Sequence, residues 1–195
     1  MNESSVLTVV LRVIDTLEGL SVPFHLGGSF ASTIHGIPRQ TANVDIVVDL
    51  AAPAGKDLVN ALSGDFYVDQ HAVDDAITRG SCFNAIHLAS GFKVDFFVMG
   101  RRQYDRVELQ RSVMQQIVAD PPRWAPVKSA EDVILRKLQW FEEGGRVSER
   151  QWKDVLGVLK TQGDRLEVAY LEEWARRLGL LDLLIKARSE ATTPN

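Results

Sequence analysis

The spacing of apolar residues predicts alternating helices and strands in the part of the chain before residue 129. Strands are expected at 24–26, 43–50, 66–68, 82–88 and 92–98. A first helix is expected to be capped by Ser4 or Ser5 and closed by Gly19, and further helices are expected at 30–35, 56–62 and 73–79. The clearest strand is 43–50, where Val44, Ile46, Val48 and Leu50 alternate with Asn43, Asp45, Val47 and Asp49. Because strand side chains alternate between the two faces of a sheet, Asp45 is expected opposite the apolar face.

From residue 129 onwards the pattern is helical alone. Ser129 is expected to begin a helix that stops at Gly144-Gly145. Ser148, with Gln151 three residues later, has the spacing of a capping box and predicts the start of the next helix. Two shorter helices are expected at about 166–178 and 180–187. We therefore predict an α/β core over 1–128, a helical cap over 129–190 and a frayed tail over 191–195.

The composition is that of an ordinary globular protein, with 45% hydrophobic and 25% charged residues. Cys82 is the only cysteine, which excludes an intramolecular disulfide and an all-cysteine zinc site and indicates a reducing compartment. The place of Cys82 within an apolar strand predicts a buried thiol. Charged residues interrupt the first apolar stretch, so we expect neither a signal peptide nor a membrane span, and a soluble, cytoplasmic protein.

The formal net charge is −4, but the charges are unevenly distributed along the chain. Residues 1–100 carry 5 basic and 11 acidic side chains, whereas residues 101–160 carry 12 and 9. The basic excess is either a set of solvated helix faces or a surface that attracts a phosphate-rich partner. The sequence alone leaves both interpretations open.

Two carboxylates stand out because each lies in the middle of a strongly apolar strand. Asp45 lies in 43–50 and Asp95 in 92–98, each on the face opposite the apolar residues. If the two strands are neighbours, both carboxylates point to one place, where hard oxygen ligands suit Mg²⁺. The alternative is that both face solvent on a one-sided sheet. The turn Gly27-Gly28-Ser29, between a strand and a helix, favours the first interpretation because such turns let backbone N–H groups approach a phosphate.

Other catalytic frameworks are absent from the sequence. The chain has no GxSxG or GxGxxG segment, and Gly55-Lys56 lacks the remaining residues of a phosphate loop. The histidines are not at metal-ligand spacing and are expected to be structural or exposed: His25, His35, His71 and His87.

Together these segments resemble the nucleotidyltransferase superfamily, which shares its core fold with DNA polymerase beta. The resemblance rests on HLGGSFA at 25–31, HGIPRQT at 35–41, VDIVV at 44–48 and Asp95 within KVDFF at 93–97. Within the superfamily the chain is most similar to abortive-infection type toxins and related uncharacterised bacterial proteins. Those proteins carry a lysine and, one helix later, an aspartate in a helical C-terminal part, where this chain has Lys137 and Asp154. The resemblance implies a mixed sheet flanked by helices.

The resemblance also implies a role for each matching residue. Gly27, Gly28 and Ser29 would hold the triphosphate of an NTP, together with Arg39 and Thr41. Asp45 and Asp95, helped by Asn43, would ligate Mg²⁺. Arg39 or Lys137 would neutralise phosphate charge, and Asp154 would orient Lys137 or a substrate hydroxyl. The alternative for Lys137 and Asp154 is an ion pair on the surface of neighbouring helices, and for Arg39 an ordinary loop arginine.

One position departs from the pattern of the superfamily. Asn43 stands at the first acidic position of the D-x-D motif, so the site has one carboxylate fewer for the two metal ions that members bind. An amide still offers an oxygen ligand but carries no charge, so metal binding is expected to be weaker. The departure affects the expected turnover more than the expected fold.

Three functional hypotheses follow. The first is a Mg²⁺-dependent transfer of a nucleoside monophosphate from an NTP to an RNA end such as tRNA, to a protein or to a small molecule. If the protein is the toxin of a toxin–antitoxin module, its partner would be an antitoxin protein. The second is a degenerate, non-catalytic module that binds nucleotide or a protein partner. The third is a structural domain without either activity. An enzyme should bind NTP far better with Mg²⁺, whereas an interaction module should be indifferent to the metal.

Overall fold

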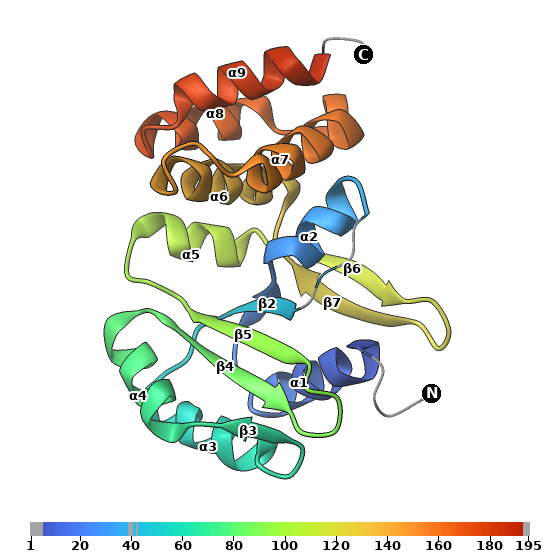
Figure 1. Cartoon of the computed structure of the whole chain (residues 1–195), viewed down its shortest axis with the longest axis vertical. Helices are drawn as coiled ribbons and strands as arrows, with labels where there is room; N and C mark the ends of the chain where they lie inside the picture. The colour runs from blue at the N-terminus through green and yellow to red at the C-terminus, as the bar shows by residue number, and fades with distance from the viewer. Residues whose placement is uncertain (1–5, 39–40, 42, 193–195) are drawn as a thin grey trace. The chain divides into compact units, whose positions relative to one another are not determined.

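The computed structural model describes residues 6–38, 41 and 43–192. The chain folds as two compact units, shown in Figure 1. The first contains the described residues of Met1–Gly27 and Thr41–Val127, and the second those of Gly28–Gln40 and Lys128–Asn195. In the described part of the chain, no helix has both the length and the apolar character that crossing a membrane requires.

The first unit is built on a mixed sheet of seven strands, in the order β3-β4-β5-β2-β1-β7-β6. The strands are β1 (Phe24–Leu26), β2 (Asn43–Val48), β3 (Phe66–Val68), β4 (Cys82–His87), β5 (Lys93–Val98), β6 (Val113–Val118) and β7 (Arg123–Val127). The central strands β2 and β5 are parallel to each other. Strand β1 pairs antiparallel with β2, and strand β4 pairs antiparallel with β5. The predicted α/β fold with a mixed sheet flanked by helices is confirmed.

The alternation seen in the sequence decides which face of this sheet is buried. The alternate apolar positions of these strands are at most 1% exposed at Val44, Ile46 and Val48 of β2 and at Val94 and Phe96 of β5. The helices of the first unit are α1 (Val6–Gly19), α3 (Ala52–Leu62), α4 (Gln70–Arg79) and α5 (Gln103–Gln110). Helices α1, α3 and α4 contribute fully buried apolar side chains to the same core, among them Ile14, Leu58 and Val73. The polar positions of β2 and β5 therefore lie on the opposite face of the sheet.

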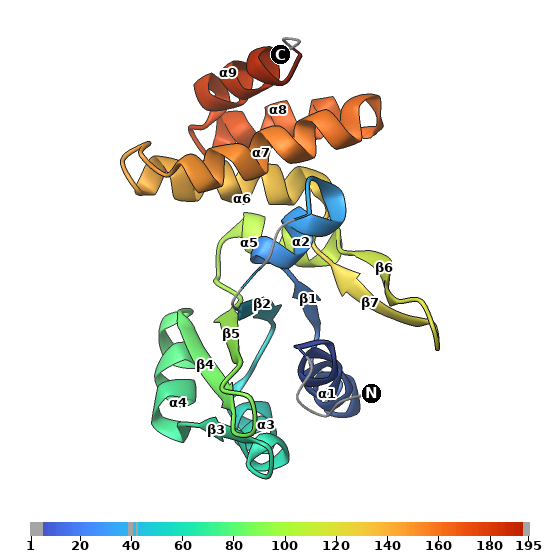
Figure 2. The same cartoon turned by 45° about the vertical axis from the view of Figure 1, so that its right-hand side comes forward.

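The second unit is helical, as predicted for the end of the chain. It contains α2 (Gly28–His35), α6 (Ala130–Glu143), α7 (Glu149–Gln162), α8 (Val168–Arg177) and α9 (Leu181–Thr192), with a short 3-10 turn at Gly163–Arg165. Helices α6 and α7 pack side by side, as Figure 2 shows, and their apolar faces bury Ile134, Leu138 and Val155. Helix α2 belongs to this unit although its sequence lies between two strands of the first.

Two local expectations at helix starts are tested by side-chain hydrogen bonds. Ser129 caps α6 as predicted, because its hydroxyl accepts from the backbone N–H of Asp132 at 3.1 Å. Ser148 likewise accepts from the backbone N–H of Gln151 at 3.4 Å. The Gln151 side-chain oxygen, however, is buried without a hydrogen-bond partner among the described residues, so only half of the predicted capping box forms.

The expectation of a buried Cys82 thiol is wrong. Cys82 is exposed at the start of β4, where exposed and buried residues alternate. The paired register places Cys82 opposite Phe97 of β5, on the sheet face away from the buried Phe83 and Phe96. The apolar residues next to Cys82 in the sequence led to the wrong prediction, because consecutive residues of a strand point to opposite faces of the sheet.

Candidate functional site

Asp45 and Asp95 are brought together by the pairing of β2 with β5. The two strands run parallel with Asp45 directly opposite Asp95, and with Asn43 opposite Lys93. Directly paired residues point their side chains to the same face of a sheet, so all four lie on the face opposite the apolar core. We refer to Asp45 and Asp95 as the aspartate pair. Of the two interpretations that the sequence left open, a shared site for both carboxylates is the one that the structure supports.

The side-chain amide of Asn43 bridges the aspartate pair. Its nitrogen donates to Oδ1 of Asp45 at 3.1 Å and to Oδ2 of Asp95 at 2.5 Å. The three predicted metal ligands therefore form one polar cluster. The asparagine also explains how two carboxylates tolerate each other at this place, because one NH₂ group supplies a donor to each.

Lys93 also belongs to the cluster, although it is not among the site residues predicted from the sequence. Its Nζ lies 2.9 Å from Oδ1 of Asp95, whose side chain is 15% exposed, while the Lys93 side chain is 47% exposed. The signal was present in the sequence, since residues two apart in a strand share a face. Lys93 and Asp95 were predicted on one face, but the ion pair itself required the three-dimensional structure.

The backbone and a threonine hold the cluster in place. The backbone N–H of Gly27 donates to the carbonyl of Asp45 at 2.8 Å, which ties the glycine turn to β2. The Thr41 hydroxyl donates to the carbonyl of Asn43 at 2.8 Å. Both residues were predicted to bind nucleotide. Their observed contacts position the strand that carries Asn43 and Asp45.

The donor set fits one divalent ion better than two. In the described part of the chain there is no group of three or more His, Cys, Asp or Glu side chains that could hold a metal. The aspartate pair supplies carboxylate oxygens, and the Asn43 amide carries an oxygen that rotation about its terminal torsion exchanges with the nitrogen. Two carboxylates and one amide oxygen suit a hard ion that completes its shell with water and phosphate. They lack the third charge that a two-ion site would use.

Ser29, the serine of the glycine turn, lies at the first turn of α2 in the second unit. Gly28 has a φ of +51°, a left-handed conformation that glycine adopts at little cost, and α2 begins there. Ser29 is 4% exposed, and Nη2 of Arg150 donates to its hydroxyl at 3.1 Å. Arg150 is a cation at this turn that sequence reasoning missed. Arg39, the cation predicted there, lies outside the described residues.

Lys137 and Asp154 form the predicted pair between α6 and α7. Nζ of Lys137 lies 2.9 Å from Oδ2 of Asp154, and the two side chains are only 5% and 7% exposed. The alternative of an ion pair on the surface is therefore wrong. A buried pair stabilises the packing of two helices only while both partners are present, because either charge alone is costly in the interior.

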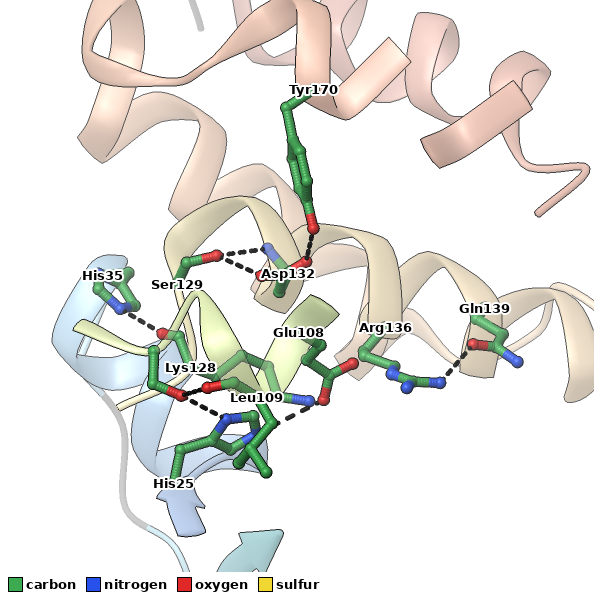
Figure 3. Close-up of polar contacts among 11 residues, drawn as sticks. His25, His35, Glu108, Leu109, Lys128, Ser129, Asp132, Arg136, Gln139 and Tyr170 are labelled. Carbon is green, nitrogen blue, oxygen red and sulfur yellow. Dashed lines mark hydrogen bonds and ion pairs between the residues drawn. The ribbon is translucent and has the colours of Figure 1, made fainter. Parts of the chain in front are cut away.

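A second polar cluster, drawn in Figure 3, fixes the start of α6 within the second unit. The Ser129 hydroxyl donates to Oδ2 of Asp132 at 2.7 Å, and the Tyr170 hydroxyl donates to Oδ1 of Asp132 at 2.7 Å. Asp132 is fully buried. Each carboxylate oxygen thus accepts at least one hydroxyl donor, which satisfies the buried group and joins α6 to α8.

His25, on β1 of the first unit, is fully buried, as expected for a structural histidine. The Ser112 hydroxyl donates to the carbonyl of Leu109 at 2.6 Å, so its oxygen accepts from Nδ1 of His25 at 2.8 Å. The other ring nitrogen lies 3.5 Å from Oε1 of Glu108 (Figure 3), whose side chain is 2% exposed. These contacts place α5 over β1 on the sheet face that carries the aspartate pair.

His35 at the end of α2 predicts a pH dependence of stability. Its Nε2 donates to the carbonyl of Lys128 at 2.8 Å, and burial lowers its pKa below the ordinary 6.5, against smaller opposing effects of that hydrogen bond and of Glu131. Below pH 6.5 the unfolded chain therefore takes up a proton before the folded chain does, so stability falls as the pH drops through this window. Urea unfolding at pH 7.5 and pH 5.5 should show a smaller pH effect in His35→Gln than in the wild type. An equal pH effect in both would assign it to other groups.

Comparison with known proteins identifies structural similarity alone. No protein-family model matches the chain, and no curated protein sequence matches it. The solution structure of the antibiotic-resistance factor ANT(2'')-Ia matches over 92% of this chain and 96% of its own, with 14% identity and a TM-score of 0.56. Its crystal structure in complex with adenylyl-2''-tobramycin matches over 87% of this chain and 96% of its own, with 13% identity and a TM-score of 0.57.

A further solved structure shows a similar match. The crystal structure of an antigenic nucleotidyltransferase-like protein from Paracoccidioides brasiliensis matches over 93% of this chain and 92% of its own. The identity is 15% and the TM-score 0.53. At identities this low, the matches establish a shared fold alone. What these proteins bind or modify is not carried over to this chain.

Proposed function

The chain has the nucleotidyltransferase fold, and from this premise we propose that it transfers a nucleoside monophosphate from an NTP to an acceptor in a Mg²⁺-dependent reaction. The observation that carries the proposal is the placement of Asp45 directly opposite Asp95 on neighbouring parallel strands. Two carboxylates side by side on one face of a central sheet offer the hard oxygen ligands that Mg²⁺ prefers, and divalent metal is the cation that phosphoryl chemistry uses.

Each residue of the cluster has a distinct part in this proposal. The aspartate pair and the side-chain oxygen of Asn43 would hold one Mg²⁺ ion. When bound, the ion would supply positive charge to the phosphates and acidify the attacking hydroxyl. Gly27 and Thr41 keep the strand that carries two of the ligands in place. The role proposed for these residues is thus to bind and orient the ion and the groups around it.

For the phosphates we propose Gly28, Ser29 and Arg150. Ser29 lies at the N-terminal end of α2, where backbone N–H groups lack partners within the helix and favour anions. Arg150 reaches the Ser29 hydroxyl with its guanidinium, a group suited to phosphate because it donates from several N–H groups in one plane. The Lys137–Asp154 pair is proposed to keep α6 and α7 together. The catalytic part predicted for this pair stays a prediction.

Replacing Arg150 tests the phosphate proposal. Arg150→Gln should weaken ATP binding by about tenfold to a hundredfold and leave adenosine binding unchanged, because a hydrogen bond to a charged group is worth roughly 1.5–3 kcal/mol. The affinities can be measured by calorimetry in the presence of Mg²⁺. Arg177→Gln is a matched control, since Arg177 is an arginine of the same unit that pairs with Glu173 on α8. Equal ATP affinity in Arg150→Gln and the wild type would remove Arg150 from the phosphate site.

The acceptor is proposed to be an RNA end such as tRNA, a protein or a small molecule. ANT(2'')-Ia, which shares the fold, is known in complex with adenylyl-2''-tobramycin, so a small molecule is one acceptor that this fold accommodates. If the protein is a toxin of a bacterial toxin–antitoxin module, an antitoxin protein would be its partner. Acceptor assays should therefore offer RNA, protein and small molecules in parallel.

A second candidate function is favoured by Asn43. Its NH₂ group occupies the space between the two carboxylates and satisfies both, so the cluster is stable without metal. A non-catalytic module that binds nucleotide or a protein partner would have such a site.

Thermal-shift titration with the four NTPs, with and without Mg²⁺, tests the proposed function. A ligand that binds only the folded state raises the melting temperature, and the rise grows with the logarithm of the ratio of ligand concentration to Kd. The nucleotidyltransferase proposal predicts stabilisation that needs Mg²⁺ and an intact triphosphate. Stabilisation that is equal with EDTA would favour the metal-independent module, and no stabilisation by any NTP would contradict nucleotide binding.

A further inference from the structure

Lys93 places a positive charge beside the aspartate pair. It begins β5, directly opposite Asn43 of β2, and its ammonium lies 2.9 Å from Oδ1 of Asp95. Asn43 donates to the other oxygen of Asp95 and to Asp45. Asp95 is thus contacted on one oxygen by the ammonium and on the other by the amide.

The charges of the cluster show what this arrangement does. The aspartate pair carries two negative charges, Lys93 one positive charge, and Asn43 none. The charge of Asp95 is therefore paired with a residue of the chain itself, before any metal binds. A divalent ion bound between the carboxylates would stand close to the ammonium, and like charges at such distances repel each other appreciably even in a solvated site.

Lys93 is also able to leave. Its side chain is 47% exposed, and an ion pair with so exposed a partner contributes little to stability. A lysine is a flexible stem with a strongly hydrated charge, so its ammonium can move into water without loss of the strand. The contact is therefore reversible, in contrast to the buried Lys137–Asp154 pair.

We propose that Lys93 is an internal counter-cation of the aspartate pair, which a divalent ion must displace from Asp95 before it can bind. Lys93 thereby lowers the metal affinity of the site and sets the metal concentration at which the site fills. It is a positioning residue, acting on the metal ligands through charge. The inference rests on the proposed function, because it needs the aspartate pair to be a metal site.

Direct binding of Mn²⁺, followed by the electron paramagnetic resonance signal of the free ion, tests this without any nucleotide or acceptor. The full chain is compared with Lys93→Met, which removes the charge, and Lys93→Arg, which keeps it. We expect Lys93→Met to bind Mn²⁺ about tenfold more tightly than the wild type, because a unit charge near a divalent ion is lost. Lys93→Arg should bind like the wild type. Lys56→Met, a charge removed from the exposed surface of α3, is the matched control and should also bind like the wild type.

The outcomes separate the inference from the function on which it rests. If the wild type binds Mn²⁺ and Lys93→Met binds it no more tightly, Lys93 does not act as a counter-cation, whereas the metal site is supported. If neither binds Mn²⁺, the metal site and the counter-cation both fail. Circular dichroism establishes that Lys93→Met is folded, and Lys93→Gln takes its place if it is not. A gain in both neutral variants and none in Lys93→Arg assigns the effect to charge.

Discussion

Asp45→Asn is expected to abolish the Mg²⁺-dependent part of NTP binding while the protein stays folded. The substitution keeps the shape of the side chain and an oxygen that can accept from Asn43, but it removes one of the two charges that would hold the ion. Loss of residues that merely support metal ligands costs 10–100-fold in affinity, so loss of a ligand charge should cost more than about 100-fold. Calorimetric titration of ATP with and without Mg²⁺ measures the effect.

Asp49→Asn is the matched control for this experiment. Asp49 follows directly after β2 and is exposed, so its neutralisation changes the same net charge without touching the aspartate pair. It should bind ATP as the wild type does. Retention of Mg²⁺-dependent binding in Asp45→Asn would show that the aspartate pair is not the metal site, and unfolding of this variant would make Asp45 a structural hydrogen-bond acceptor.

The second large effect is expected on stability, at the buried ion pair of the helical unit. Lys137→Met leaves the carboxylate of Asp154, 7% exposed in the folded chain, without the ammonium that lies 2.9 Å away. Removal of one partner of a buried ion pair costs about 3–5 kcal/mol in the free energy of unfolding. Urea unfolding of the wild type and of Lys137→Met measures the loss.

A double variant distinguishes a structural from a catalytic role for this pair. Lys137→Met with Asp154→Leu replaces both charges by apolar groups of similar size, which is often neutral or stabilising. If the pair only holds α6 to α7, the double variant should regain wild-type stability and wild-type ATP binding. Regained stability with lost ATP binding would instead give Lys137 or Asp154 the direct part in the site that the sequence resemblance implied.

The strand that carries the site was predictable because its pattern is unambiguous. The alternation over 43–50 fixed which side of β2 is buried, and the same pattern in 92–98 placed Asp95 on the matching side. The pairing of β2 with β5 was not predictable in the same way. The strands are separated by β3, β4 and two helices, and no local spacing indicates which strands become neighbours.

The segment between residues 99 and 128 was missed because it has no clear period. Helix α5 is polar over much of its surface and buries residues such as Asp105 and Glu108 along with Tyr104. Strand β6 at the edge of the sheet leaves Val113 and Met114 exposed. Prediction from hydrophobic periodicity assumes that apolar residues are buried and polar residues exposed. The buried Asp105 and Glu108 and the exposed Val113 and Met114 depart from that assumption.

Two cations, Lys93 of the first unit and Arg150 of the second, show the limit of sequence reasoning most clearly. Lys93 lies in a strand that was predicted correctly from the sequence. Its ion pair with Asp95, however, depends on the conformations of the two side chains. Arg150 contacts Ser29 across 121 residues of sequence, and it looks like any exposed arginine near a helix start. The pattern of hydrophobic residues along the sequence does not indicate which groups such long side chains contact in the folded chain.

Transfer of label from NTP to acceptor tests the central claim most directly. Attack on the α-phosphate leaves the α-label on the acceptor and releases the γ-label with pyrophosphate. The wild type and Asp45→Asn are incubated with Mg²⁺, with NTP labelled at the α- or the γ-phosphate, and with tRNA, total protein or a small-molecule extract. The wild type should transfer the α-label, and no γ-label, to one of these acceptors, and Asp45→Asn should transfer neither. Transfer of γ-label would contradict nucleotidyl transfer, and absence of any transfer despite Mg²⁺-dependent NTP binding would identify the chain as a nucleotide-binding module without catalysis.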